Sequence, residues 1–304
     1  MIYTVTFNPA IDYIININKL EKGKINFAEE SNILPGGKGI NVSTVLTNLE
    51  IENIALGFIG GFSGQEIKNR LKKLGVNTDF IEVEKGLTRI NIKIKEKNIE
   101  TAINCNSLII EDKDIKEFLN KLDKLKNDDI LVLSGSIPTC VDESIYEKIC
   151  KSVYKKGTKV VIDARKKLLK NALQYNPFLI KPNRAELEEL TDCKIKNFED
   201  IIENAKKMQE LGAKNILVSM GEEGAILVSH NGKIYKQKAP TGKLINSVGA
   251  GDSMIAGFLA GYIAYDDYEK ALKMGVAAGS ASAFSSNLAT KEETYKLFNR
   301  KGGN

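Results

Sequence analysis

A short run of small residues ends in a carboxylate, in the sequence Val248-Gly249-Ala250-Gly251-Asp252. Gly249, Ala250 and Gly251 let backbone N–H groups turn toward a bound anion, and the helix that they open adds its positive dipole end. Asp252, in the first helical turn, could take the proton of a hydroxyl that attacks a phosphate. An acid there also stabilises a helix without any catalytic role, and one loop does not decide between these interpretations. Phosphoryl transfer depends mainly on positioning and charge, so Asp252 needs no raised pKa.

A second group of residues suits a phosphorylated, hydroxyl-rich ligand. The run Pro35-Gly36-Gly37-Lys38-Gly39-Ile40-Asn41 combines glycines that permit close backbone approach with a point charge on Lys38 and a donor and acceptor on Asn41. This run lacks the leading glycine and the Ser/Thr after the lysine of a Walker A loop. Farther along, Arg89 lies on the polar face of an alternating strand. It could clamp a phosphate in a bidentate manner or simply face solvent.

Strands and helices must bring these residues together. Beyond the first third of the chain, strands alternate with helices, which predicts βαβ units and a mainly parallel central sheet. Three polar loops follow strands and begin at Ser134, Asp163 and Lys181. Such loops gather at the sheet edge where open α/β sheets bind ligands. Segments 11–33 and 88–106 are too polar on one face for central parallel strands, so we expect a small separate β-layer there.

Further residues suggest a nucleotide and its metal. Asn183 and Glu186 stand three residues apart on one helix face, which fits either a helix cap with a first-turn acid or a water-mediated magnesium site. The loop 219–224 contains two glycines and lies one element before Gly249. It could flank a nucleotide or be an ordinary turn between strands. The small residues around Ala277 allow close packing against another helix or against an adenine ring.

Composition limits the classes of function. The 304 residues carry a formal net charge of +5 from 44 basic and 39 acidic residues, mostly interleaved, and no basic cluster contains aromatics, which argues against nucleic acid as a partner. The four cysteines form no C-x-x-C pair and the single histidine, His230, lies in a turn-like sequence, so neither a zinc site nor histidine catalysis is expected. No signal peptide is evident, and no apolar run reaches the ~20 residues that span a bilayer. We therefore expect a cytoplasmic protein without a membrane partner.

Taken together, these motifs resemble those of the ribokinase-like, PfkB-type family of sugar kinases, in its phosphosugar branch. Its two signatures match the Gly-Gly-Lys-Gly-Ile-Asn run around Lys38 and the Gly-Ala-Gly-Asp run that ends at Asp252. Intermediate stretches agree in order over nearly the whole chain, at 8–12, 88–93, 134–138, 181–186 and 219–224. The resemblance implies a single α/β domain over 1–304, a three-layer α/β/α sandwich with a mainly parallel central sheet. It also implies a β-sheet lid from 11–33 and 88–106, through which two subunits could form a homodimer.

The same resemblance implies transfer of the γ-phosphoryl group of ATP, with Mg²⁺, to the free primary hydroxyl of fructose 1-phosphate. Tagatose 6-phosphate is the alternative acceptor. The alternative from another class is a protein of the same fold that senses a nucleotide or sugar phosphate without turnover, and the intact Asp252 argues against it. An unphosphorylated sugar is disfavoured because it would leave Lys38 and Arg89 without a partner.

The resemblance also assigns a role to each candidate residue. Asp252 is the expected catalytic base, and Gly249, Ala250 and Gly251 are expected to hold the charge of the migrating phosphoryl group. The expected sugar-phosphate ligands are Asp12, Gly37, Lys38, Asn41, Arg89, Asn104, Ser136 and Asp252, with Lys38 and Arg89 on the phosphate. The expected nucleotide contacts are Lys181, Asn183, Ser219, Met220, Gly221, Glu222, Glu223, Gly224, Gly251, Ala277 and Ser280. Asn183 and Glu186 are expected to hold magnesium indirectly, through water.

Overall fold

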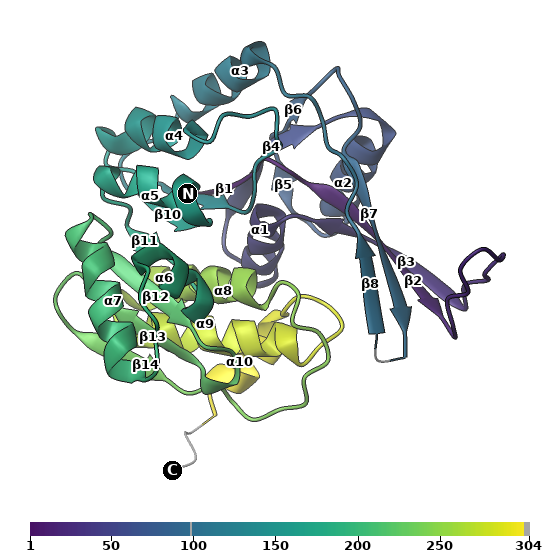
Figure 1. The fold of residues 1–304 in the computed structure, drawn as a ribbon. Helices are drawn as coiled ribbons and strands as arrows, with labels where there is room; N and C mark the ends of the chain where they lie inside the picture. The colour runs from purple at the N-terminus through teal and green to yellow at the C-terminus, as the bar shows by residue number, and fades with distance from the viewer. Residues whose placement is uncertain (98, 301–304) are drawn as a thin grey trace.

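The computed structural model describes residues 1–97 and 99–300 (Figure 1). Asn98 of the expected lid and residues 301–304 of the expected domain therefore lie outside the described residues. The strands are β1 (Ile2–Thr6), β2 (Ala10–Ile17), β3 (Glu30–Gly36), β4 (Asn53–Ile59), β5 (Asn77–Thr78), β6 (Ile81–Glu82), β7 (Arg89–Glu96), β8 (Ile99–Ile103), β9 (Ile130–Ser134), β10 (Lys159–Asp163), β11 (Leu179–Ile180), β12 (Asn215–Ser219), β13 (Ala225–Val228) and β14 (Ile234–Gln237). The α-helices are α1 (Lys38–Asn48), α2 (Gly61–Lys73), α3 (Asp112–Leu122), α4 (Ile145–Tyr154), α5 (Lys166–Ala172), α6 (Arg184–Thr191), α7 (Phe198–Glu210), α8 (Ala250–Tyr265), α9 (Tyr268–Ala283) and α10 (Lys291–Phe298).

The large sheet has the strand order β14-β13-β12-β11-β10-β9-β1-β4-β5, with β6 also paired to β4. All pairs from β12 to β5 are parallel, and only β13 and β14 run antiparallel to their neighbours. Parallel strands need both faces covered by crossover helices, which explains why β9 is entirely buried. The expectation of a mainly parallel central sheet is confirmed.

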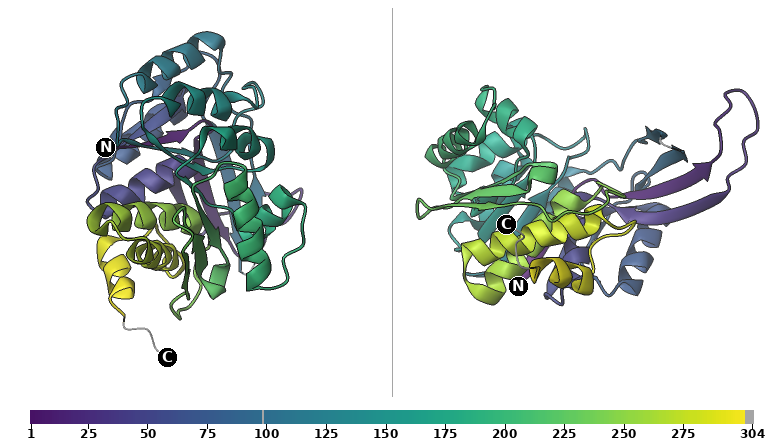
Figure 2. Two further views of the ribbon diagram at one scale, coloured as in Figure 1. Left: turned by 90° about the vertical axis from the view of Figure 1, so that its left-hand side faces the viewer. Right: turned by 90° about the horizontal axis from the view of Figure 1, so that it is seen from below.

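Helices cover both faces of this sheet, as Figure 2 shows from two further sides. The strand β9 illustrates the division, because its side chains alternate between two cores. Leu131 and Leu133 belong to the core beneath α3 to α7, whereas Ile130 and Val132 belong to the core beneath α1, α8 and α9. The three layers expected from the sequence are therefore present.

A second sheet of four strands, in the order β3-β2-β7-β8, projects from the body of the molecule (Figures 1 and 2). The parallel pairing of β2 with β7 sets Ala10 against Arg89, Asp12 against Asn91 and Ile14 against Lys93. Every second residue of a strand shares one face, so this register gathers charged and amide side chains on a single face of the lid. We call these four strands the lid.

The carboxyl ends of the parallel strands position the site. Ser134 ends β9, Asp163 ends β10 and Ser219 ends β12, while Lys181 follows β11 directly. All four ends lie at one edge of the sheet, where α1 and α8 begin. In the described part of the chain, no helix combines the length and apolar character needed to cross a bilayer.

Candidate functional site

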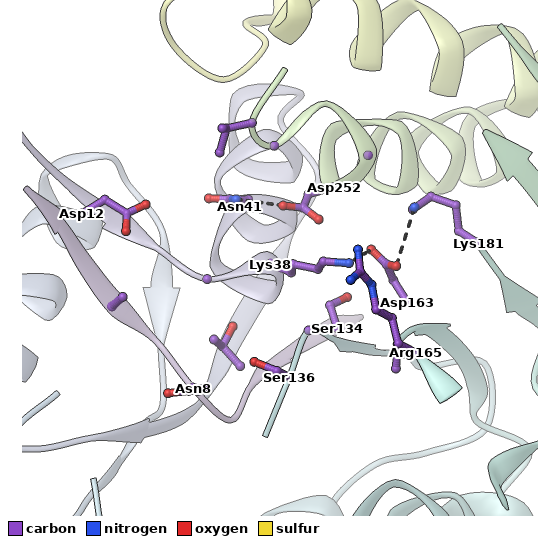
Figure 3. A pocket seen from close by; sticks show the side chains of 18 of the residues that line it. Asn8, Asp12, Lys38, Asn41, Ser134, Ser136, Asp163, Arg165, Lys181 and Asp252 are labelled. Carbon is purple, nitrogen blue, oxygen red and sulfur yellow. Dashed lines mark hydrogen bonds and ion pairs between the residues drawn. The ribbon is translucent and has the colours of Figure 1, made fainter. Parts of the chain in front are cut away.

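A polar cavity of about 670 Å³ lies at this edge of the large sheet, with the lid forming one wall (Figure 3). Its volume suits a sugar phosphate together with the phosphates of a second ligand. The expected sugar-phosphate ligands Asp12, Gly37, Lys38, Asn41, Arg89, Asn104, Ser136 and Asp252 all line it. Side chains separated by more than 200 positions in the sequence therefore meet around one cavity.

Asp252 lies in the first turn of α8, and Gly249 is the residue just before that helix, with a φ of 79° in the left-handed region. The Asp252 carboxylate is 5% exposed and accepts a hydrogen bond from Asn41 Nδ2 at 2.8 Å. Burial and the neighbouring charge of Asp163 raise the pKa of Asp252 to about 6, against the opposing effects of Asn41 and Lys38. Phosphoryl transfer does not require this rise, but a carboxylate with a pKa near 6 is ionised at pH 7 and is also a stronger proton acceptor than a free aspartate.

Backbone N–H groups of the small-residue run face the same region. The N–H of Ala250 donates to Ser247 O at 3.3 Å, so this donor is already engaged. Within the described residues, the N–H groups of Gly249 and Gly251 have no hydrogen-bond partner. A Cβ added to Gly251 would lie 3.3 Å from Lys181 Nζ, which places the ammonium group against the run. The N–H groups of Gly249 and Gly251 thus remain for an anion at the N-terminus of α8, with the Lys181 ammonium group beside them.

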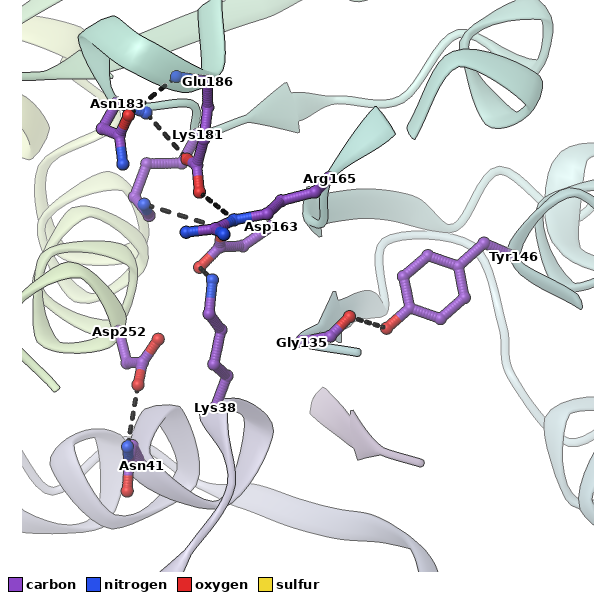
Figure 4. Close-up of polar contacts among 10 residues, drawn as sticks. All are labelled: Lys38, Asn41, Gly135, Tyr146, Asp163, Arg165, Lys181, Asn183, Glu186 and Asp252. Carbon is purple, nitrogen blue, oxygen red and sulfur yellow. Dashed lines mark hydrogen bonds and ion pairs between the residues drawn. The ribbon is translucent and has the colours of Figure 1, made fainter. Parts of the chain in front are cut away.

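Asp163 is the main residue of the cavity to which the sequence analysis gave no role. Its Oδ2 pairs with Lys38 Nζ at 3.1 Å and its Oδ1 with Lys181 Nζ at 3.6 Å (Figure 4). Burial alone would lower the pKa of Lys38, but the surrounding carboxylates, led by Asp163 and Asp252, raise it. The position of Asp163, directly at the end of a buried strand, was the sequence signal that could have identified it.

The lid forms a second charged group. Asp12 accepts hydrogen bonds from Asn91 Nδ2 at 3.0 Å and from Lys93 Nζ at 2.8 Å. Arg89 donates from Nη2 to Asn8 O at 3.2 Å, while its buried Nε has no partner in the described residues. Burial lowers the pKa of Arg89 and Asp12 opposes that effect. On β7 the sequence led to a role for Arg89 alone, although Asn91 and Lys93 follow at a spacing of two on the same strand face.

The two cations expected on one phosphate face different carboxylates. Lys38 is paired with Asp163 and lies in the field of Asp252, whereas the charge near Arg89 is that of Asp12. Figure 3 draws Lys38 pointing toward Asp163 and away from Asp12. The cavity therefore has an Asp252 end, with Lys38, Asp163 and the N-terminus of α8, and a lid end with Arg89.

A second cavity of about 650 Å³ adjoins the first and shares Ser219 and Gly251 with it. The expected nucleotide contacts divide between the two. Lys181 and Asn183 line the first cavity, and Ser219, Gly221, Glu222, Gly224, Gly251 and Ser280 line the second. Three expected contacts line neither: Met220 and Ala277 are buried at 8% and 2% exposure, and Glu223 pairs with Arg184 at 2.9 Å. On α9 the neighbours Val276 and Gly279 take the place expected for Ala277, because they face the opening.

Asn183 and Glu186 form a reciprocal cap at the start of α6. Asn183 Oδ1 accepts from Glu186 N at 2.8 Å, and Glu186 Oε2 accepts from Asn183 N at 3.0 Å. Glu186 Oε1 also accepts from Arg165 Nε at 2.8 Å. Among the described residues no group of three or more His, Cys, Asp or Glu could bind a metal directly. Carboxylate oxygens retain a lone pair in these bonds, so the pair fits a hydrated magnesium ion held through its waters.

Comparisons with known proteins agree over nearly the full length. The model of the family described as pfkB family carbohydrate kinase matches residues 5–294. The chain is 44% identical over 297 residues to a 1-phosphofructokinase of Bacillus subtilis, covering 98% of this chain and 97% of the relative. It is 35% identical over 289 residues to a D-tagatose-1-phosphate kinase of Bacillus licheniformis, covering 95% and 94%. The solved structure of phosphofructokinase-2 from Escherichia coli in complex with fructose-6-phosphate has a TM-score of 0.90 at 25% identity, covering 98% of this chain and 97% of that one.

Proposed function

The chain belongs to the pfkB family of carbohydrate kinases, and on that premise we propose that it transfers the γ-phosphoryl group of ATP to the free primary hydroxyl of fructose 1-phosphate, giving fructose 1,6-bisphosphate. The similarity to a 1-phosphofructokinase supports this acceptor. One structural observation supports the proposal most: a buried carboxylate at the Asp252 end and a cationic lid end with Arg89 border the same cavity. A ketose with one phosphate and one free primary hydroxyl matches those two ends.

The acceptor would bind with its phosphate at the lid end. Arg89 has an unpaired buried Nε, and Lys93, which pairs with Asp12 at 2.8 Å, is a second cation at this end. Charge-assisted and bidentate contacts from Arg to a phosphate are the strong ones, so this end orients the sugar. The hydroxyls would bind Asp12 of the lid, Asn41 beside Asp252 and the backbone near Gly37, which all line the cavity.

The donor nucleotide would enter from the second cavity. Its base would lie among the residues of 219–224 and the small residues of α9, and its phosphates would reach the first cavity past Ser219 and Gly251. Asn183 and Glu186 would hold the hydrated magnesium ion. When bound, that ion neutralises part of the phosphate charge. A donor of this kind and four unpaired cysteines support a cytoplasmic location.

In the reaction, the acceptor hydroxyl attacks the γ-phosphorus in line with the leaving oxygen of ADP. The new O–P bond forms as the bond to the β-phosphate oxygen breaks, and the hydroxyl proton passes to Asp252. The N–H groups of Gly249 and Gly251, together with Lys38 and Lys181, would stabilise the charge on the transferred oxygens. Asn41 would hold the Asp252 carboxylate in place through its 2.8 Å hydrogen bond.

A second acceptor has a specific observation in its favour. The relative named D-tagatose-1-phosphate kinase is 35% identical to this chain, and tagatose 1-phosphate differs from fructose 1-phosphate only in the configuration of one hydroxyl. Tagatose 6-phosphate, the alternative from the sequence, is named by neither of the two relatives above and stays a prediction.

An acceptor panel under identical MgATP conditions tests the proposal. We expect fructose 1-phosphate to give the highest kcat/KM among fructose 1-phosphate, tagatose 1-phosphate, tagatose 6-phosphate, fructose 6-phosphate and ribose, measured by ADP release. A panel in which ribose equals the phosphosugars would refute the role of the cationic lid end. If no acceptor in the panel gives ADP, the better hypothesis is a protein that senses a nucleotide or sugar phosphate without turnover.

The lid also supports the proposed homodimer. Ile25 and Phe27, in the connection between β2 and β3, are each 84% exposed, and Ile99 on β8 is 63% exposed. Apolar side chains this exposed on a projecting sheet are typical of a surface that a partner covers. Sedimentation of the native chain and of Phe27→Asp tests this: we expect a dimer and a monomer, respectively, and a native monomer would contradict it.

A further inference from the structure

Arg165 lines the cavity at the Asp252 end, yet the proposed mechanism gives it no role. It follows β10 two residues after Asp163, and its only hydrogen bond within the described residues runs from Nε to Glu186 Oε1 at 2.8 Å. Its side chain is 69% exposed, whereas that of Glu186 is 11% exposed. The guanidinium therefore extends into open space from a buried anchor.

Most of the hydrogen-bonding capacity of Arg165 is unused. A guanidinium carries five N–H donors in a rigid fork, and the bond to Glu186 uses one of them. Within the described residues, Nη1 and Nη2 have no hydrogen-bond partner. Figure 4 draws the guanidinium beside the Asp163 carboxylate, between Glu186 and Lys38. The remaining donors can therefore face the region where phosphates would enter.

The charges at this end of the cavity favour a mobile cation. Lys38 and Lys181 are both engaged by the buried carboxylate of Asp163, and Lys181 is itself 5% exposed. Arg165, with a side chain 69% exposed against 37% for Lys38, is the most exposed cation of this group, and its Nη groups can turn while Nε keeps its bond to Glu186. A nucleoside triphosphate brings several negative charges toward the carboxylates of Asp163, Glu186 and Asp252. A further cation that can move toward the phosphates, beside the magnesium ion and the two lysines, would balance part of this charge.

We propose that Arg165 binds the terminal phosphate of the nucleotide donor, exchanging or sharing its contact with Glu186 when the nucleotide enters. The inference rests on the proposed function in taking a nucleoside triphosphate as donor, and it assigns a phosphate-binding role to a residue outside both family motifs. The free N–H groups of a guanidinium can donate to two oxygens of one phosphate, which a lysine ammonium does less well.

Nucleotide binding measured by calorimetry with EDTA present tests the proposal without relying on turnover. The ligands are ATP and AMP, and the proteins are wild type, Arg165→Ala and Arg165→Lys. The matched control is Lys167→Ala, a neighbouring exposed cation that pairs with Glu143 and does not line the cavity. Loss of charge-assisted contacts should weaken ATP binding by about 10-fold to 100-fold in Arg165→Ala, with AMP unchanged. Arg165→Lys should recover part of the loss, and Lys167→Ala should bind ATP like wild type.

Three results would overturn the proposal: ATP affinity of Arg165→Ala within twofold of wild type, an equal loss for ATP and AMP, or the same loss in Lys167→Ala. Thermal melting of each variant shows whether the fold is intact, and the exposed position of Arg165 predicts that it is. If wild type binds ATP neither with EDTA nor with Mg²⁺ present, the donor of the proposed function fails as well. If wild type binds and uses ATP but Arg165→Ala binds it equally well, only the role of Arg165 fails.

Discussion

Replacing the buried carboxylate in Asp252→Asn should remove activity and stabilise the fold at the same time. The variant keeps the size of the side chain and loses the proton acceptor. Removal of a positioned base typically costs ~10²–10⁴-fold in rate, so we expect kcat to fall within that range while ATP still binds. Stability should change in the opposite direction, because the folded protein holds an ionised carboxylate in a buried position.

The magnitude follows from the pKa. A rise in the pKa of Asp252 from 3.8 to about 6 corresponds to ~3 kcal/mol at 1.36 kcal/mol per pH unit. Because the pKa is raised in the folded state, this contribution to stability is fully present below about pH 4. It is lost as the pH rises through about 6. The asparagine variant lacks this loss, so its advantage should grow from near zero at pH 4 to ~3 kcal/mol at pH 8.

Two assays check this prediction. A coupled assay for ADP gives kcat, and urea unfolding at pH 4 and at pH 8 gives the free energy of unfolding of both proteins. Retention of more than a tenth of wild-type kcat would refute the role of Asp252 as base. An unfolding free energy at pH 8 equal to or below that of wild type would refute the claim that the ionised carboxylate is costly in its buried position.

Three further predictions follow from the same geometry. Arg89→Ala should raise KM for the phosphosugar ~10-fold to 100-fold, because a charge-assisted contact contributes ~1.5–3 kcal/mol, while KM for ATP changes less than twofold. Steady-state kinetics with each substrate varied measure both values, and an unchanged sugar KM would remove Arg89 from the site. Asp163→Asn removes a charge that raises the pKa of Asp252, so the acidic limb of the pH profile of kcat/KM should move to lower pH; a limb that stays or moves to higher pH would contradict the assigned cause. Gly39→Ala should destabilise the fold by ~1–3 kcal/mol in urea unfolding, since the added Cβ would lie 2.5 Å from Val5 O, and a loss under 0.5 kcal/mol would show that α1 can shift away from β1.

The fold could be predicted from local patterns because each pattern has one structural solution. The alternation of strand-like and helix-like segments predicted the parallel sheet. The alternation of apolar and polar residues in 88–106 predicted the lid strands β7 and β8. The run ending at Asp252 led to a residue in the first turn of a helix, as the start of α8 at Ala250 now shows. These features depend on residues close in sequence, where spacing alone carries the information.

The parts that sequence reasoning missed depend on contacts between distant segments. Asp163 joins Lys38 and Lys181 only after β10, β11 and the start of α1 have been placed side by side, and the raised pKa of Asp252 follows from burial that no local pattern reveals. Ala277 was expected beside a nucleotide on the basis of its small size. Which side of α9 faces the cavity depends on the packing of that helix against α8.

A crystal structure of the chain with fructose 1-phosphate and a non-hydrolysable ATP analogue would show whether Asp252 and Arg89 bind opposite ends of one sugar. We expect the sugar phosphate to contact Arg89 and the free primary hydroxyl to lie within hydrogen-bond distance of an Asp252 carboxylate oxygen, facing the terminal phosphate of the analogue. A sugar bound in the opposite direction, with its phosphate against Asp252, would contradict this expectation.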